Sequence, residues 1–228
     1  NGLSLIFSQA FFAFLALGLF AYFQIKKSLI STLLVILTIG LSPWWITSSS
    51  LPWNGHMYVS WVFLAMISLW FKNPIFISAL LFGISIAIDP AAILALPILF
   101  YEWWTQEKRI KNLKLIFSGL LLPWTPILIF EIITRGFLIR HWLQYPSAAG
   151  IIFSPKLTNI LPLLNTIGIS QAQAIVILVI SFLIAPKRGR YWMIFVCLPL
   201  IFLALVSPLR DYYLLGLVSS FILFSVIS

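Results

Sequence analysis

The most constraining feature of this chain is a run of 56 residues, from Ser42 to Pro97, in which only Lys72 and Asp89 carry a fixed charge. Three apolar runs within it are separated by short polar interruptions, at Asn54–His56, after Phe71 and at Asp89. A bilayer imposes this pattern, because backbone groups in lipid must pair within a helix and polar interruptions survive where they meet water or line a cavity. The run therefore predicts several membrane-spanning helices.

The composition supports an integral membrane protein of the all-α class. Of the 228 residues 62% are hydrophobic and 8% are charged, whereas an ordinary soluble domain carries about 25% charged residues. The formal net charge of +9 would suggest nucleic acid in a soluble protein. In a membrane protein, basic residues accumulate in cytoplasmic loops instead, so we expect no nucleic-acid partner. The single Cys197 permits no internal disulfide.

We predict a polytopic transmembrane helical bundle of about nine spans. The expected spans are Leu3–Phe23, Leu29–Ile46, Met57–Phe71, Ile75–Ile88, Ala91–Trp104, Leu115–Ile133, Ala172–Ala185, Tyr191–Val206 and Tyr212–Ser228. Asp89-Pro90 is expected to form the tip of a tight helical hairpin, and the charge-rich stretch Thr105–Lys114 a solvated loop. The chain begins without Met and stops within an apolar run, so residues 1–228 are expected to be one transmembrane domain inside a longer chain.

The basic residues predict the orientation of these spans. The loops that contain Lys26, Lys72, Lys108 and Lys187 hold ten of the fourteen basic residues, so we expect them to be cytoplasmic, in a bacterial inner membrane. A set of twelve polar and charged side chains then gathers on the extracytoplasmic face. They are Asn54, His56, Asp89, Glu131, Arg135, Arg140, His141, Lys156, Arg210, Asp211, Tyr212 and Tyr213.

Cations beside apolar helix ends are suited to a phosphate whose lipid tail stays in the membrane, and arginine grips phosphate oxygens at two points. Each residue also has a purely structural interpretation. His56 and Asp89 fit helix caps, Arg135 and Arg140 fit the headgroup layer, and Arg210 could pair with its neighbour. The one-sided clustering favours a site. The candidate substrate-binding residues are His56, Asp89, Arg135, Arg140, His141, Arg210, Tyr212 and Tyr213.

Several familiar motifs are absent from the sequence. It contains no glycine-rich nucleotide loop, no Cys/His cluster for zinc, and neither GxSxG nor HExxH. We therefore expect no cofactor, and nothing in the sequence indicates a metal.

Three stretches carry a family resemblance. The first is Leu41-Ser42-Pro43 followed by the polar interruption at Leu51–His56, and the second is the hairpin Leu80–Trp104 followed by a basic loop. The third is Ser207–Leu217 (SPLRDYYLLGL). In this order the chain resembles the GT-C membrane glycosyltransferases, in particular the dolichyl-phosphate-mannose–protein mannosyltransferase-like group that includes bacterial aminoarabinose transferases. The likeness extends over nearly the whole chain, and its motifs are largely apolar.

The resemblance implies transfer of a sugar from a polyprenyl-phosphate donor to a protein, lipid or glycan acceptor outside the cytoplasm, with inversion. It also implies that the catalytic carboxylate lies in a loop upstream of Asn1, so the catalytic residue is unknown here. Arg210, Tyr212 and Tyr213 match the family pattern best and would lie near the donor phosphate. The chain departs from the family at Asn54–His56, where an acidic residue is common, and at Asp89, where the family has lysine.

Two other classes of function fit the same pattern. One is a transporter or lipid flippase with a polar cavity that opens outward, and the other is a membrane scaffold related to the family but without its activity. An enzyme would keep the polar face open to the outside, whereas a transporter would expose it alternately.

Overall fold

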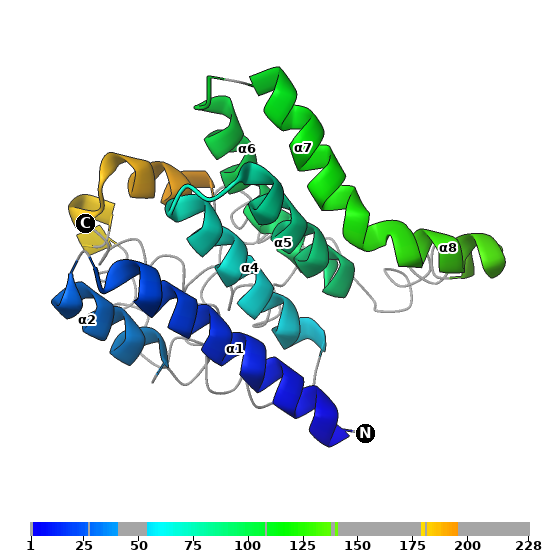
Figure 1. Ribbon diagram of the computed structural model, residues 1–228, viewed down its shortest axis with the longest axis horizontal. Helices are drawn as coiled ribbons and strands as arrows, with labels where there is room; N and C mark the ends of the chain where they lie inside the picture. The colour runs from blue at the N-terminus through cyan, green and yellow to red at the C-terminus, as the bar shows by residue number, and fades with distance from the viewer. Residues whose placement is uncertain are drawn as a thin grey trace, which may run out of the picture.

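The computed structural model of the protein describes residues 2–26, 28–40, 54–107, 109–137, 140, 179–180 and 182–195. This part of the chain consists of helices and turns and contains no strand (Figure 1), which confirms the all-α class. The elements are α1 (Gly2–Gln24), α2 (Leu29–Gly40), α4 (Asn54–Trp70), α5 (Ile75–Ile88), η1 (Pro90–Ala95), α6 (Leu96–Trp104), α7 (Arg109–Leu121), η2 (Leu122–Trp124) and α8 (Thr125–Ile133). A further helical stretch covers residues 187–195.

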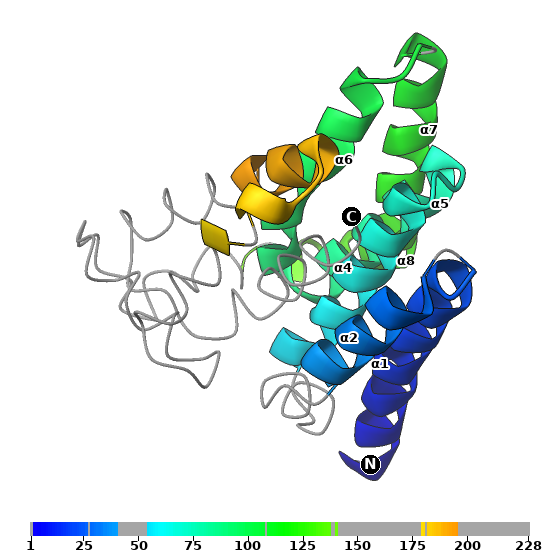
Figure 2. The ribbon, with the colours of Figure 1, turned by 90° about the vertical axis from the view of Figure 1, so that its left-hand side faces the viewer.

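Helices α1, α4, α5 and α7 pack side by side in that order, as Figures 1 and 2 both show. The centre of the core is α4, where every residue from Val62 to Trp70 is buried. A helix that is buried on all sides needs no polar face, and this explains the uninterrupted apolar run Val62–Ile67.

The hairpin predicted at Asp89-Pro90 is confirmed. Helix α5 ends at Ile88, Asp89 is its C-cap in an extended conformation (φ −147°, ψ 124°), and the 3-10 helix begins at Pro90. Proline cannot donate the hydrogen bond that would continue α5. The chain therefore turns at Asp89 and returns through η1 and α6.

The stretch Thr105–Lys114 was expected to be a solvated loop. Residues 105–107 form a turn and Glu107, Lys111 and Lys114 are exposed, but the second half of the stretch is helical, so the prediction of a loop is wrong there. Helix α7 begins at Arg109. Leu113 and Ile116 recur at helical spacing, no proline interrupts Arg109–Leu121, and Ile116 is fully buried. The helix buries Ile116 in the core, and its lysines Lys111 and Lys114 stay exposed and solvated on the same helix.

Two glycines bring α5 and α7 into backbone contact. A Cβ atom added to Gly83 would lie 2.6 Å from the carbonyl oxygen of Leu120, and one added to Gly119 would lie 2.8 Å from the Cβ of Ala79. Both distances are shorter than van der Waals contact, so only glycine fits at these positions. Close approach through small residues is a common way for apolar helices to pack in a membrane.

The outer surface of the bundle is apolar. On α1, Phe7, Phe11 and Phe14 are 72%, 62% and 72% exposed. Among the described residues, two segments are long and apolar enough to cross a membrane, Phe7–Gln24 and Ile110–Ile133, and only 33% and 17% of these windows are buried. Helices in the core of a soluble protein would be mostly buried, so the exposure favours association with a membrane. Nine spans are not established by these two segments, and the count stays a prediction.

Candidate functional site

Two of the predicted site residues, Arg135 and Arg140, lie in one turn at the end of α8. Helix α8 closes with the Gly136 amide donating to the Glu131 carbonyl at 2.8 Å, and Arg135 and Gly136 adopt φ values of 54° and 81°. This is the Schellman arrangement, which satisfies the last carbonyls of a helix. Arg140 folds back over the turn and donates from Nη2 to the Arg135 carbonyl at 2.9 Å. Both arginines are exposed, and the structure places them together.

Helix α8 buries its acidic residue and exposes its apolar ones. Glu131 is 7% exposed, and the side chains around it face outward: Leu128, Ile129, Phe130, Ile132 and Ile133 are 44% to 78% exposed. In water this arrangement would be inverted, because apolar surface is driven inward. The helix also bends away from α7 at η2 (Figure 1), where Pro123 interrupts the helix. The arginine pair therefore ends a helix whose outer surface suits lipid.

Asp89 and the start of α4 lie at one end of the α4–α5 pair. The Ser85 hydroxyl donates to the Tyr58 carbonyl at 3.5 Å, so the last turn of α5 lies beside the first turns of α4. The backbone of His56 belongs to the first turn of α4, which begins at Asn54, rather than to a preceding loop. The structure thus brings the positions of His56 and Asp89 to the same end of the bundle, as the topology predicted.

The other predicted site residues lie outside the described part of the chain. They are His141, Arg210, Tyr212 and Tyr213, together with the side chain of His56. Within the described residues, no group of three or more His, Cys, Asp or Glu side chains is arranged to hold a metal ion.

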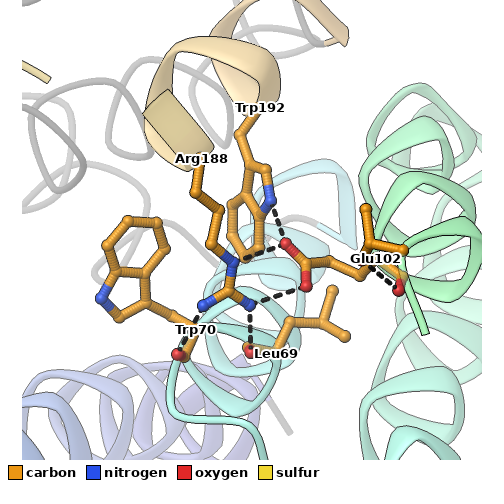
Figure 3. A network of polar contacts seen from close by, with 6 residues as sticks. Leu69, Trp70, Glu102, Arg188 and Trp192 are labelled. Atoms are coloured by element: carbon orange, nitrogen blue, oxygen red, sulfur yellow. Dashed lines mark hydrogen bonds and ion pairs between the residues drawn. The ribbon is translucent and has the colours of Figure 1, made fainter. Parts of the chain in front are cut away.

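A polar network that the local sequence patterns do not predict lies at the opposite end of the bundle. It consists of Leu69, Trp70, Glu102, Arg188 and Trp192 and is called the Arg188 network below (Figure 3). The guanidinium of Arg188 contacts both carboxylate oxygens of Glu102 at 2.7 Å, from Nε and from Nη2. The fork of arginine matches a carboxylate in this two-point geometry. The side chain of Arg188 is 27% exposed and that of Glu102 is 10% exposed.

The same guanidinium caps α4. Arg188 donates from Nη1 to the Trp70 carbonyl at 3.0 Å and from Nη2 to the Leu69 carbonyl at 2.8 Å. The last carbonyls of a helix have no intrahelical donor, and a cation near them also complements the helix dipole. Arg188 therefore serves two acceptor sets at once, the carboxylate and the helix end.

Two tryptophans complete the Arg188 network. The indole Nε1 of Trp192 donates to Glu102 at 2.5 Å. The guanidinium carbon of Arg188 lies 5.0 Å from the Trp70 ring centroid and 5.3 Å from that of Trp192, within the range of cation–π attraction. The network joins the ends of α4 and α6 to the helix at residues 187–195. That helix lies more than 80 residues after both of these helix ends in the sequence.

The Arg188 network lies at the end of the bundle that carries most of the exposed basic side chains among the described residues. Phe23 of α1 stacks on Phe71 at 5.0 Å, so the end of α1 also lies there. We call this end the basic end. Its exposed cations among the described residues are Lys26, Lys72, Lys111, Lys114, Lys187 and Arg190.

No protein-family description, no curated protein and no solved structure matches the chain.

Proposed function

We propose that the protein is an integral membrane glycosyltransferase that moves a sugar from a polyprenyl-phosphate donor to an extracytoplasmic acceptor, with inversion. The observation that supports this most directly is the exposed pair Arg135 and Arg140 at the end of an apolar, exposed α8. Guanidinium groups bind phosphate oxygens, and an exposed apolar surface binds apolar chains. One surface of this kind suits an amphiphile with an anionic head and a hydrocarbon tail.

The proposed chemistry assigns roles to side chains of this chain. The acceptor hydroxyl attacks the sugar carbon, its proton passes to a base that we do not assign, and the bond from the sugar to the phosphate breaks. Arg210, assisted by Arg135 or Arg140, would stabilise the negative charge that develops on the leaving phosphate. Asp89 and His56 would orient hydroxyl groups of the sugar or the acceptor.

The membrane arrangement is part of the same proposal. About nine spans would cross a bacterial inner membrane, with the Lys26, Lys72, Lys108 and Lys187 loops in the cytoplasm. The gathering of exposed cations at the basic end supports this orientation. The arginine pair would then face the outside, where α7 and α8 lead away from the basic end.

The conformation of Arg135 allows a clean test. Because its φ of 54° is one that glycine adopts freely, Arg135→Gly removes the charge and leaves the turn intact. We expect the full-length protein with Arg135→Gly to transfer radiolabelled sugar from a polyprenyl phosphate at least about tenfold more slowly than the unaltered protein. Arg135→Lys, which keeps the charge, should lose less. Unchanged transfer in Arg135→Gly would remove this residue from the site.

A transporter would behave differently in a labelling experiment. If the protein moves its ligand across the membrane, labelling of a cysteine placed at Asp89 should switch sides when a polyprenyl-phosphate sugar is added. A glycosyltransferase should show labelling from the outside only, with and without that donor. Alternating accessibility would contradict the proposed function.

A further inference from the structure

The exposed face of α7 changes character along the helix. In its first two turns this face carries Lys111 and Lys114, both exposed, next to Ile110, which is 81% exposed. In the following turns it carries Phe117 and Leu121, which are 48% and 58% exposed. Residues three, four and seven apart share one side of a helix, so cations and apolar side chains form one continuous strip.

The corner that precedes this strip is held by hydrogen bonds. The Asn112 amide donates to Gln106 Oε1 at 2.5 Å, and the Thr105 hydroxyl donates to the Glu102 carbonyl at 2.9 Å. Trp104, 60% exposed, lies at the same corner. A tryptophan beside lysines is typical of the level of a bilayer where headgroups meet acyl chains. The strip is therefore presented by an ordered corner.

The charge around the corner is strongly one-sided. At the basic end the described acidic residues are Glu102 and Glu107, and Glu102 is paired with Arg188. Glu107 is then the acidic side chain left to offset six exposed cations. Away from the basic end, Asp89 and Glu131 equal Arg135 and Arg140 in number. An anionic partner at the basic end is favoured by this imbalance.

We propose that an anionic phospholipid binds lengthwise along α7, with its headgroup at Lys111 and Lys114 and its acyl chains against Phe117 and Leu121. A helix rises about 1.5 Å per residue, so Lys114 and Leu121 are about 10 Å apart along the axis, which fits the upper part of one leaflet of an apolar core about 30 Å thick. A soluble anion would need the lysines alone. The apolar half of the strip commits the proposal to a lipid.

The proposal depends on membrane association and is independent of sugar transfer. The test is binding of phosphatidylglycerol and of phosphatidylcholine to the purified full-length protein in detergent, measured by native mass spectrometry. We expect a preference for phosphatidylglycerol that falls about thirtyfold in the double variant Lys111→Gln, Lys114→Gln, since each lysine near an anionic headgroup contributes about 1 kcal/mol and about 1.4 kcal/mol corresponds to a factor of ten.

The matched control is Lys26→Gln with Lys187→Gln, which removes equal charge from the same end of the bundle and should change the preference less than about twofold. Phe117→Ala with Leu121→Ala should weaken the binding of phosphatidylglycerol but leave the binding of soluble glycerol phosphate unchanged. Equal loss in the control pair, or no preference in the unaltered protein, would overturn the proposal. These outcomes do not depend on whether the protein transfers sugar.

Discussion

Replacing Arg188 with leucine tests whether the Arg188 network holds the basic end together. The change removes donors from the carboxylate of Glu102 and from the Leu69 and Trp70 carbonyls. Removing one partner of a buried ion pair costs about 3 to 5 kcal/mol. Because the side chain of Arg188 is 27% exposed, water can partly solvate the carboxylate left behind, and the lower end of that range applies. We expect Arg188→Leu to lower the free energy of unfolding by about 3 kcal/mol.

Replacing Glu102 with glutamine should cost less. The amide oxygen can still accept from Trp192, and Arg188 keeps both backbone carbonyls of α4. What is lost is the charge of the two-point pair, so we expect a cost of about 2 kcal/mol. Reversible unfolding of the purified protein in mixed micelles, with increasing sodium dodecyl sulfate, measures both variants on one scale.

Exchanging the two charges separates the ion pair from the helix cap. A variant with Glu102→Arg and Arg188→Glu restores an ion pair, but a glutamate at position 188 cannot donate to the Leu69 and Trp70 carbonyls. We therefore expect no recovery beyond the stability of Arg188→Leu. The control is Arg190→Leu, because Arg190 donates to the Ala185 carbonyl at 2.8 Å and is exposed; its cost should stay below about 1 kcal/mol. Full recovery in the exchanged variant would refute the capping role.

Three further predictions address the packing, the turns and the orientation. Gly83→Ala should destabilise the protein by about 2 kcal/mol in the same micelle assay, because its Cβ would meet a backbone carbonyl at 2.6 Å; a cost near zero would contradict the α5–α7 contact. Lys72, with φ 57°, should tolerate glycine within about 1 kcal/mol, whereas Lys72→Val should cost about 2 kcal/mol; equal stabilities would contradict the left-handed turn. In a Cys197→Ser background, a cysteine at Asn73 should react with a membrane-impermeant maleimide only after the cells are opened, and one at Phe137 should react in intact cells. The reverse labelling pattern would invert the proposed orientation.

The elements best predicted from the sequence are those bounded by local signals. Helix α5 has the predicted bounds, Ile75–Ile88, because Pro74 precedes it and Asp89-Pro90 follows it. Helix α1 differs from the predicted Leu3–Phe23 by one residue at each end. The start of helix α7 differs from the prediction because its charges are also typical of a solvated loop. Its apolar spacing, with Ile116 turned into the core, was the better indicator.

The Arg188 network could not be predicted from local patterns. Glu102 and Arg188 are 86 residues apart, and no rule of spacing connects them. A partial signal was present, because an acidic residue within an apolar helix is costly without a partner. Glu102 lies in the predicted span Ala91–Trp104, so a cationic side chain is expected to pair with its carboxylate. The sequence offers several basic residues at the predicted cytoplasmic side, and choosing among them required the tertiary arrangement.

The Arg188 network also links the stability of the basic end to its charge. In the folded protein Arg188 neutralises Glu102, so the carboxylate does not offset the cations at the α6–α7 corner. Arg188→Leu would leave a negative charge there, and Glu102→Gln would leave a positive one. The two variants should therefore shift phosphatidylglycerol binding in opposite directions although both lower stability. A purely mechanical role for the network would instead weaken lipid binding in both, since both loosen the contact between α6 and the helix at residues 187–195.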